Sequence, residues 1–472
     1  MLRFANSASC WLPNNPLRGV ARGAQLLLVT LGLTATSLAQ TAPTVVSVAD
    51  SRTLAFNLVS RGQPTPARAI ANTLLERNPN DIKALLVLSR AERLLGDLPA
   101  AKQAGKRAWR AADAPEDRYT AAMLTAQAIS SSGNKIGAQI WLRRAAQVAP
   151  NDQLKATAVR DLRYVRGTSP VALSFDLSVA PSSNINNGSK SDTIEVFGLP
   201  FALSGDLQAL SGVEYSLGAT LSYKLPAVGT WTLTAGANVE SKHYTLSSSA
   251  KAIAPTVSGS DYAFQQLQVS LAANRTDADR KASTSLYVKA GQNWYGGSTL
   301  TRFAGVGAAR QYQIGERSSL QVNLGAERQW RQDNAQRSAD VVTLSSTWGH
   351  GLTNGSAIWV TGFVRDTASE SSSIAQETAG ASLNYSHGKP IFADTKLELS
   401  IGYENKRFDR AQFPFVRRED QTVSASATMI FSNLDYMGFA PTAELSAKRT
   451  SSTLGQYSND DLGLKLGLRS TF

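Results

Sequence analysis

Alternation of apolar and polar residues dominates the chain after Pro170. In residues 173–179 every odd position is apolar and every even position is polar, and the same pattern recurs in 283–293, 394–406 and 461–472. Successive side chains of a strand point to opposite faces, so each run predicts a strand with one apolar face. The polar faces carry Lys, Glu and Arg, and the strands are long for a soluble sandwich. The pattern therefore predicts a transmembrane antiparallel β-barrel with lipid outside and a wet interior.

Turn signals divide this region into about fourteen strands. They lie near 171–180, 212–225, 230–243, 260–274, 281–294, 299–313, 317–330, 338–349, 355–367, 376–387, 393–408, 417–431, 438–449 and 458–472. Short connections follow even strands, and longer ones, such as 181–211, 244–259, 367–375 and 409–416, mostly follow odd strands. Outer-membrane barrels have short periplasmic turns and longer external loops, which predicts that both ends of the barrel segment face the periplasm. Tryptophans 231, 294, 330, 348 and 359 are candidates for the aromatic girdles.

From residue 52, within the segment 40–169, the sequence has a helical pattern with self-similarity at about 34 residues. Each unit has a Gly at an inter-helix turn, followed five residues later by a small Ala that lets two helices approach: Gly62 and Ala67, Gly96 and Ala101, Gly133 and Ala138. This resembles the tetratricopeptide repeat. The aromatic expected early in the first helix is absent, however, and the second-helix aromatic is replaced by Ala71, Gly105 and Leu142. The resemblance implies a peptide-binding array, and a structural spacer is the alternative.

Residues 1–39 have the pattern of a secretory signal. Three Arg precede an apolar run at 24–35, and Ser37-Leu38-Ala39 supplies small residues before a mature start near Gln40. The single cysteine, Cys10, lies in this segment, so the mature chain is expected to lack Cys. The predicted organisation is a signal peptide at 1–39, a periplasmic tetratricopeptide-like helical domain at 40–169 and an outer-membrane β-barrel at 170–472.

Charge is concentrated in the helical domain. Residues 41–169 contain 19 Lys and Arg against 10 Asp and Glu, a net charge of +9, whereas residues 170–472 contain 26 of each. A basic surface attracts acidic partners or lipid headgroups, and solubility alone is the alternative. No nucleic-acid partner is predicted.

The sequence offers little material for chemistry. It has three His residues, His243, His350 and His387, near the ends of predicted strands and without metal-like spacing. No nucleophile motif stands out. The fragment Gly305-Val-Gly307 lies inside a strand and lacks the third glycine of a nucleotide-binding loop. We predict no enzymatic activity, no cofactor and no metal site.

Two local phrases resemble the surface lipoprotein assembly modifier family. The first is the Asn-rich segment 180–187, with Asn184, Asn186 and Asn187, followed by Gly-Leu-Pro-Phe at 198–201 and Ser-Gly at 211–212. The second is Gly-Phe-Ala-Pro at 438–441, then Tyr-Ser-Asn at 457–459 and a terminal Phe. The family places the Ser-Asn pair before a Tyr, which is the reverse of the order here. An ordinary turn is an alternative role for the Asn residues.

The resemblance implies an outer-membrane translocon of a Gram-negative bacterium. Its periplasmic repeats would engage a client lipoprotein or secreted binding protein, and its barrel would help that client reach the cell surface alongside the barrel-assembly machinery. The alternatives are an exopolysaccharide export porin, whose repeat arrays are much longer, and a general diffusion porin.

The last twelve residues, "DLGLKLGLRSTF", form the most regular strand. We expect Leu462, Leu464, Leu466, Leu468 and Phe472 to face lipid. The strand is expected to close the barrel against the strand near 171–180, because an open edge in hydrocarbon leaves backbone groups unsatisfied. Leu464, Leu466, Leu468 and Phe472 resemble the signal that the barrel-insertion machinery reads.

Overall fold

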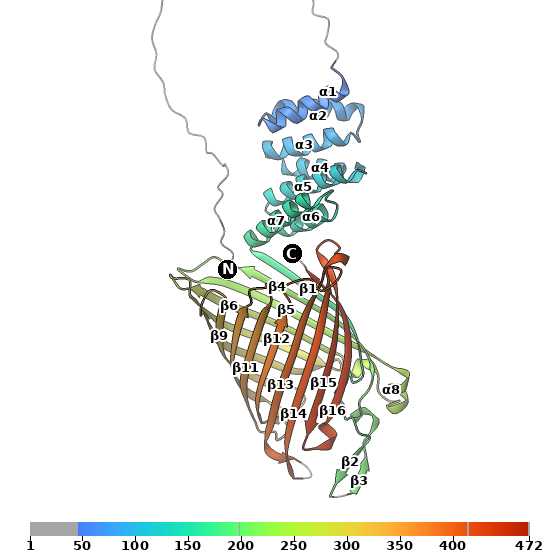
Figure 1. The fold of residues 1–472 in the computed structure, drawn as a ribbon, viewed down its shortest axis with the longest axis vertical. Helices are drawn as coiled ribbons and strands as arrows, with labels where there is room; N and C mark the ends of the chain where they lie inside the picture. Colours follow the sequence, from blue (N-terminus) through green and yellow to red (C-terminus); the bar gives the residue numbers. More distant parts are fainter. Residues whose placement is uncertain (1–45, 198, 413–414, 471–472) are drawn as a thin grey trace, which may run out of the picture.

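A computed structural model describes residues 46–197, 199–412 and 415–470. A stack of helices stands on one end of a β-barrel (Figure 1). The predicted signal peptide 1–39, Gly198 and the terminal Phe472 lie outside the described residues. The predicted fold class, a helical array followed by an antiparallel barrel of about fourteen strands, is confirmed.

The helical array consists of consecutive helices that pack as antiparallel neighbours. They are α1 (Val48–Ser60), α2 (Pro64–Arg77), α3 (Ile82–Leu95), α4 (Leu98–Ala111), α5 (Pro115–Ser131), α6 (Lys135–Gln147) and α7 (Asp152–Thr168). Side-chain caps begin several of them: Asp81 accepts a hydrogen bond from the Ala84 amide, and Asn151 accepts one from the Leu154 amide. These caps satisfy backbone donors that a helix start otherwise leaves unpaired.

The turns between paired helices use left-handed glycines. Gly62, Gly96 and Gly133 have φ angles of 77°, 90° and 83°, which residues with a Cβ rarely adopt. The small alanines Ala67, Ala101 and Ala138 are fully buried between helices.

Close approach of α4 and α5 also explains why the repeat lacks an aromatic at Gly105. A Cβ on Gly105 would lie 2.4 Å from Thr125 Oγ1. The bulk of this layer comes instead from Trp109 and Trp141, whose rings meet edge to face at 5.6 Å.

Fourteen strands within the described residues form the closed barrel. They are β1 (Val171–Ser182), β4 (Gly212–Lys224), β5 (Thr232–Leu246), β6 (Phe264–Thr276), β7 (Ala282–Tyr295), β8 (Ser298–Gln313), β9 (Ser318–Arg331), β10 (Ala339–Gly351), β11 (Ala357–Ser369), β12 (Gln376–Ser386), β13 (Thr395–Gln412), β14 (Val416–Phe431), β15 (Phe439–Ser452) and β16 (Asn459–Ser470). Each pairs antiparallel with its neighbours, and β16 meets β1 to close the barrel. A separate hairpin of β2 (Thr193–Val196) and β3 (Leu199–Ala202) extends from the end opposite the helices (Figure 1).

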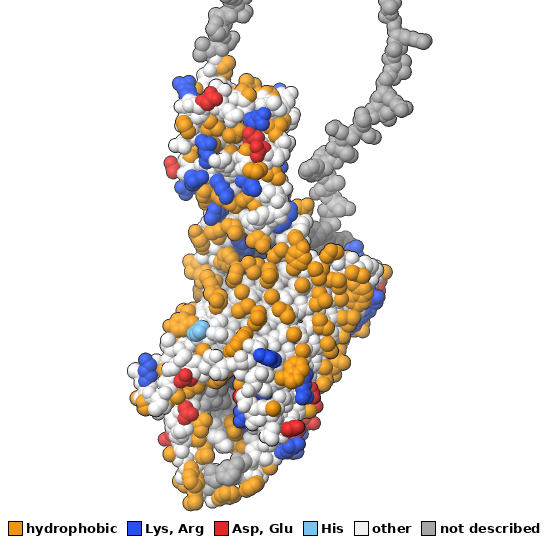
Figure 2. All heavy atoms as spheres, turned by 180° about the vertical axis from the view of Figure 1, so that it is seen from behind, with side chains coloured by type: hydrophobic (Ala, Val, Ile, Leu, Met, Phe, Trp, Pro, Cys, Tyr) orange, Lys and Arg blue, Asp and Glu red, His pale blue; other side chains and the backbone are white. Residues whose placement is uncertain are grey.

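The barrel wall has an apolar outer face. On β16, Leu462, Leu464, Leu466 and Leu468 are 42–58% exposed, as expected from the alternation. Figure 2 shows apolar side chains spread over the wall, whereas Lys and Arg gather on the helical array and at the barrel ends. Within the described residues, no helix is long and apolar enough to cross a membrane.

The predicted aromatic girdle is only partly correct. Trp348 and Trp330 are exposed, alternate in step with the outward-facing residues of their strands, and lie near opposite ends of the wall. The assignment of Trp359 to the girdle is wrong, because Trp359 is the register partner of Gly349 on the lumen side. A Cβ on Gly349 would lie 3.0 Å from the indole, so the glycine leaves room for an inward Trp.

The predicted contrast in loop length holds mainly for the first two connections at the far end. Residues 183–211 carry β2, β3 and η1 (Gly205–Leu207), and residues 247–263 carry α8 (Ser248–Ile253) and η2 (Gly259–Tyr262). The next connection there is the tight turn Gly296–Gly297, whose positive φ angles suit a two-residue hairpin. The predicted loop 409–416 is wrong, because β13 continues through Gln412 after a register shift beyond Arg407.

Candidate functional site

An open groove on the helical array is the first candidate site. It is a hollow of about 520 Å³ between α1, α3 and α5. Its floor is apolar, with Val59, Leu86 and Val87 buried. Phe56 stands in it with 56% of its surface exposed. An exposed aromatic beside a buried apolar floor is suited to receive an apolar side chain of a partner.

The rim of this groove is basic. Arg52 pairs with Asp81 at 2.8 Å, and Lys83 pairs with Asp117 at 2.6 Å. Arg90 hydrogen-bonds only to the Ser60 hydroxyl, at 3.4 Å, and no ion pair to it occurs among the described residues. Burial and, to a lesser extent, the nearby Arg90 lower the pKa of Arg93. Arg90 therefore offers a cation that can pair with an acidic group next to the apolar floor.

The array is mounted directly on the barrel rim. Arg143 of α6 donates to the carbonyls of Met437 and Gly438, at 2.9 and 3.3 Å, and to the Ser470 hydroxyl at 3.0 Å. Its guanidinium also lies 4.6 Å from the Phe439 ring centroid. Burial and the neighbouring Arg166 lower the pKa of Arg143, while Asp435 opposes this effect. One side chain thus ties the array to the β14–β15 turn and to the end of β16.

The β14–β15 turn is shaped to receive Arg143. Met437 and Gly438 both have positive φ, 52° and 77°, as in a two-residue hairpin turn. The Met437 amide donates to the Gln147 side-chain oxygen at 2.6 Å. The predicted phrase Gly-Phe-Ala-Pro at 438–441 therefore lies where the array contacts the barrel.

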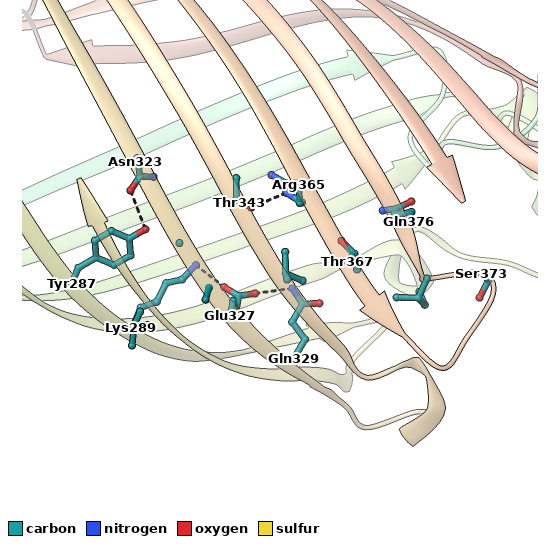
Figure 3. A pocket seen from close by; sticks show the side chains of 15 residues that line it. Tyr287, Lys289, Asn323, Glu327, Gln329, Thr343, Arg365, Thr367, Ser373 and Gln376 are labelled. Carbon is teal, nitrogen blue, oxygen red and sulfur yellow. Dashed lines mark hydrogen bonds and ion pairs between the residues drawn. The ribbon is translucent and has the colours of Figure 1, made fainter. Parts of the chain in front are cut away.

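The lumen holds a second candidate site, a polar cavity of about 500 Å³ (Figure 3). Lys289 pairs with Glu327 at 2.6 Å, and Gln329 donates to the same carboxylate at 2.7 Å. The Tyr287 hydroxyl donates to Asn323 at 3.4 Å. These partners satisfy the Lys289 and Glu327 charges within the barrel wall, whereas the buried side-chain oxygen of Gln376, also in the lining, has no hydrogen-bond partner among the described residues. The cavity is therefore wettable.

The Asn-rich phrase folds into a hydrogen-bonded loop at the far end. Asn184 is 3% exposed, and its amide donates to the Gly188 and Asp460 carbonyls at 3.0 and 3.3 Å. Asn186 donates to the Asp206 and Gln208 carbonyls and accepts from the Leu210 amide. Asn187 adopts a left-handed φ of 52°, which Asn tolerates. The loop thereby lies against the start of β16.

The structure brings the predicted Asn-rich segment and the leucines of β16 together, and it leaves the repeat glycines and alanines apart from them. The Asn-rich loop contacts β16, the strand of Leu464, Leu466 and Leu468, through Asp460 and Leu462. The repeat glycines and alanines lie in the array, at the other end of the barrel. The sequence reasoning missed Arg143 and the groove residues, although the net charge of +9 over 41–169 pointed to this domain.

The histidines lie on the outer face rather than in a reactive cluster. His350 stacks on Trp348 and hydrogen-bonds to the Ser318 hydroxyl at 2.8 Å. His387 hydrogen-bonds to the Tyr385 hydroxyl at 2.8 Å. Across the described ranges, no group of three or more His, Cys, Asp or Glu side chains is placed to hold a metal ion.

Comparison with known proteins places this architecture in a family. Residues 172–472 match the family described as surface lipoprotein assembly modifier, and no curated protein matches the chain. The type III secretion translocator chaperone SycD of Yersinia enterocolitica is 18% identical and aligns over 25% of this chain and 86% of its own, with a TM-score of 0.23.

Two solved structures align with a larger share of the chain. A bacterial polysaccharide outer membrane secretin is 9% identical over 63% of this chain and 98% of its own, with a TM-score of 0.33. The outer membrane channel DcaP of Acinetobacter baumannii is 10% identical over 64% and 97%, with a TM-score of 0.38. Because the family match spans the whole barrel, this chain belongs to the surface lipoprotein assembly modifier family.

Proposed function

We propose that this protein is an outer-membrane translocon that delivers client proteins, surface lipoproteins or related binding proteins, to the cell surface. The observation that carries the proposal is that the helical array, which bears an apolar-floored groove lined by Arg52, Lys83 and Arg90, is mounted on the rim of a closed barrel through Arg143. A client held in the groove would be tethered to the barrel through the array, at a high effective concentration. Family membership supports the surface lipoprotein role.

The array would lie in the periplasm, with the Asn-rich loop outside the cell. The even strand count returns the end of β16 to the rim that carries the helices. In outer-membrane barrels the longer loops face outward, and here the longest connections, 183–211 and 247–263, lie at the opposite end. Residues 1–39 would direct export and then be removed.

The groove would bind an extended client segment in which an apolar side chain is flanked by acidic ones. Phe56 and Leu86 would contact the apolar side chain, and Arg90 would pair with a carboxylate. The protein would act without catalysis or a cofactor. The barrel-assembly machinery would insert it by reading Leu464, Leu466, Leu468 and Phe472, with no nucleic-acid partner involved.

A photo-crosslinking amino acid at Phe56 tests the groove. Leu54 is the matched control, because it lies on the same helix with similar exposure, 47% against 56%, and does not line the groove. We expect lipoproteins to crosslink from position 56 and not from position 54 in intact cells. Equal crosslinking at both positions would refute specific engagement by the groove.

A polysaccharide exporter or a diffusion porin would behave differently. Deleting the gene of an exporter removes secreted polymer and leaves lipoprotein exposure intact. Deleting a porin lowers small-solute uptake alone. The proposed translocon predicts the opposite pattern, in which lipoprotein exposure falls while polymer and solute uptake persist.

A further inference from the structure

Among the described residues, the seam between β1 and β16 has fewer register partners than any other junction of the barrel. Within the described residues, their register partners are Ser178 with Gly467, Val179 with Leu466, and Ser182 with Gly463. On its other edge, β1 pairs with β4 continuously from Val171 to Ser182. On its other edge, β16 pairs with β15 continuously from Asn459 to Ser470. Each strand is therefore held firmly by one neighbour and weakly by the other.

Proline accounts for part of this weakness. In the seam register, Pro181 stands opposite Leu464. The Ser183 amide, two residues further along the chain, donates to the Leu462 carbonyl of β16. Because alternate residues of a strand direct their backbone groups to the same neighbour, the backbone of residue 181 also faces β16. Proline has no amide hydrogen, so one backbone bond across the seam cannot form. A proline inside a strand is typical of an edge rather than of a central position.

Side chains on the helical-array side of the seam do not replace the missing backbone bonds. Asp176 and Arg469 stand opposite each other in the seam register, yet they form no ion pair within the described residues. Arg469 pairs instead with Glu398 of β13 at 2.8 Å, beyond β14 and β15. The Arg469 guanidinium is thus directed away from β1.

The far end of the same seam is clamped. The Ser182 hydroxyl donates to Asp461 at 2.7 Å, and the Asn184 amide donates to the Asp460 carbonyl at 3.3 Å. The Lys190 amide donates to the Ser458 carbonyl at 3.0 Å. The loop after β1 therefore fastens one end of a seam that is loosely paired toward the other end.

An apolar hollow of about 540 Å³ lies on the outer face of the seam. Its lining includes Leu177 and Val179 of β1, Leu466 and Leu468 of β16, and Tyr215 and Leu217 of β4. The leucines and the valine are 41–50% exposed. The hollow therefore faces outward where the wall is least paired, in a position suited to hydrocarbon chains.

We propose that the β1–β16 seam is the passage site for the acyl chains of a lipid-anchored client, a role that rests on the proposed translocon function. The lumen-facing side chains include Lys289, Glu327 and Arg365, so an acyl chain drawn through the lumen would lose its hydrocarbon surroundings along its whole length. Parting of the seam lets the chains stay in the bilayer while the polar part of the client passes through the lumen.

A disulfide across the seam tests this role. Ser178 Cβ lies 3.6 Å from the position that a Cβ on Gly467 would take, within the range that a disulfide needs. The variant pair is S178C with G467C, in the full-length chain, where Cys10 is the only native cysteine. The matched control is S382C with G402C, a lumen-facing Ser–Gly pair on the continuously paired β12 and β13, with a corresponding separation of 4.0 Å.

The probe is surface biotinylation of intact cells, which detects newly exposed lipoproteins before and after oxidation. We expect oxidation of the seam pair to abolish labelling of every lipoprotein that depends on this gene, and reduction to restore it. The oxidised control pair should label like the wild type. Heat-modifiable gel mobility confirms that each barrel has folded.

The outcomes separate the two proposals. Normal lipoprotein exposure with a fully crosslinked seam overturns the seam passage and leaves the translocon function intact. Equal loss in the seam and control pairs also overturns it, since barrel rigidity in general would then be responsible. If no lipoprotein depends on the gene, the translocon function itself fails.

Discussion

Replacing Arg143 with Ala should release the helical array from the barrel rim. The side chain donates to two carbonyls of the β14–β15 turn and lies over Phe439. A hydrogen bond from a charged group contributes about 2 kcal/mol net, and an exposed cation–π contact about 0.5 kcal/mol or more. Because Arg143 is only half-buried, we use about 2 kcal/mol for the whole contact, which corresponds to roughly a 30-fold fall in the ratio of docked to undocked arrays.

Spin labels on a chain without other cysteines measure this change. One label is placed at N72C on α2 of the helical array, and the other at T353C in the β10–β11 turn, at the barrel end that carries the array. Both positions are exposed. Wild-type protein should give one narrow distance distribution by double electron–electron resonance. R143A should add a broad second population, and R143K should lie between the two because a Lys donates to fewer partners.

Arg144 supplies the matched control for the docking contact. Its guanidinium lies 4.5 Å from the Trp141 ring, inside the array, and R144A removes an equal charge without touching the barrel. A narrow, unchanged distribution in R143A would refute the docking argument. The same broadening in R144A would show that array stability, and not the rim contact, had been measured.

Three further predictions concern the array, one loop and the chain end. G96A should lower the array's free energy of unfolding by about 1 kcal/mol because its φ is 90°, whereas G167A, in open space on α7, should not lower it, as urea titration would show. The hydrogen bond from Arg331 holds the pKa of Asp333 well below its usual range. The loop 332–338 should therefore keep its hydrogen-exchange protection, corrected for intrinsic rates, from neutral pH down to about pH 4, and lose it only as the pH falls through that lowered pKa. Loss of protection already at pH 5 would contradict this. F472A should reduce the amount of heat-modifiable barrel in membranes, and F431A, at the end of an internal strand, should not.

The barrel was predictable because the two faces of each strand lie in different surroundings. Lipid on one side and a wet lumen on the other impose a period of two, which a sequence shows directly in segments such as 462–468. The repeat turns were equally local, since a left-handed Gly96 and a buried Ala101 lie five residues apart. Local signals of this kind need no knowledge of what packs against them.

The docking contact and the seam could not be predicted in the same way. Arg143 meets Met437 across 294 residues of sequence, and nothing near either residue marks the other as its partner. Trp359 has the right residue type for a girdle, yet its parity sends it into the lumen. The seam pairing depends on how β1 and β16 meet after the barrel closes, which alternation within each strand does not determine.

The most direct test of the translocon function is the exposure of lipoproteins on intact cells that lack this protein. External protease and surface biotinylation would be compared in the wild type, the deletion strain, and the deletion strain complemented with the full-length chain. We predict that at least one lipoprotein remains synthesised and lipidated but becomes protease-resistant and unlabelled in the deletion strain, and that complementation restores its exposure. Unchanged exposure of all surface lipoproteins in the deletion strain would contradict the proposed function.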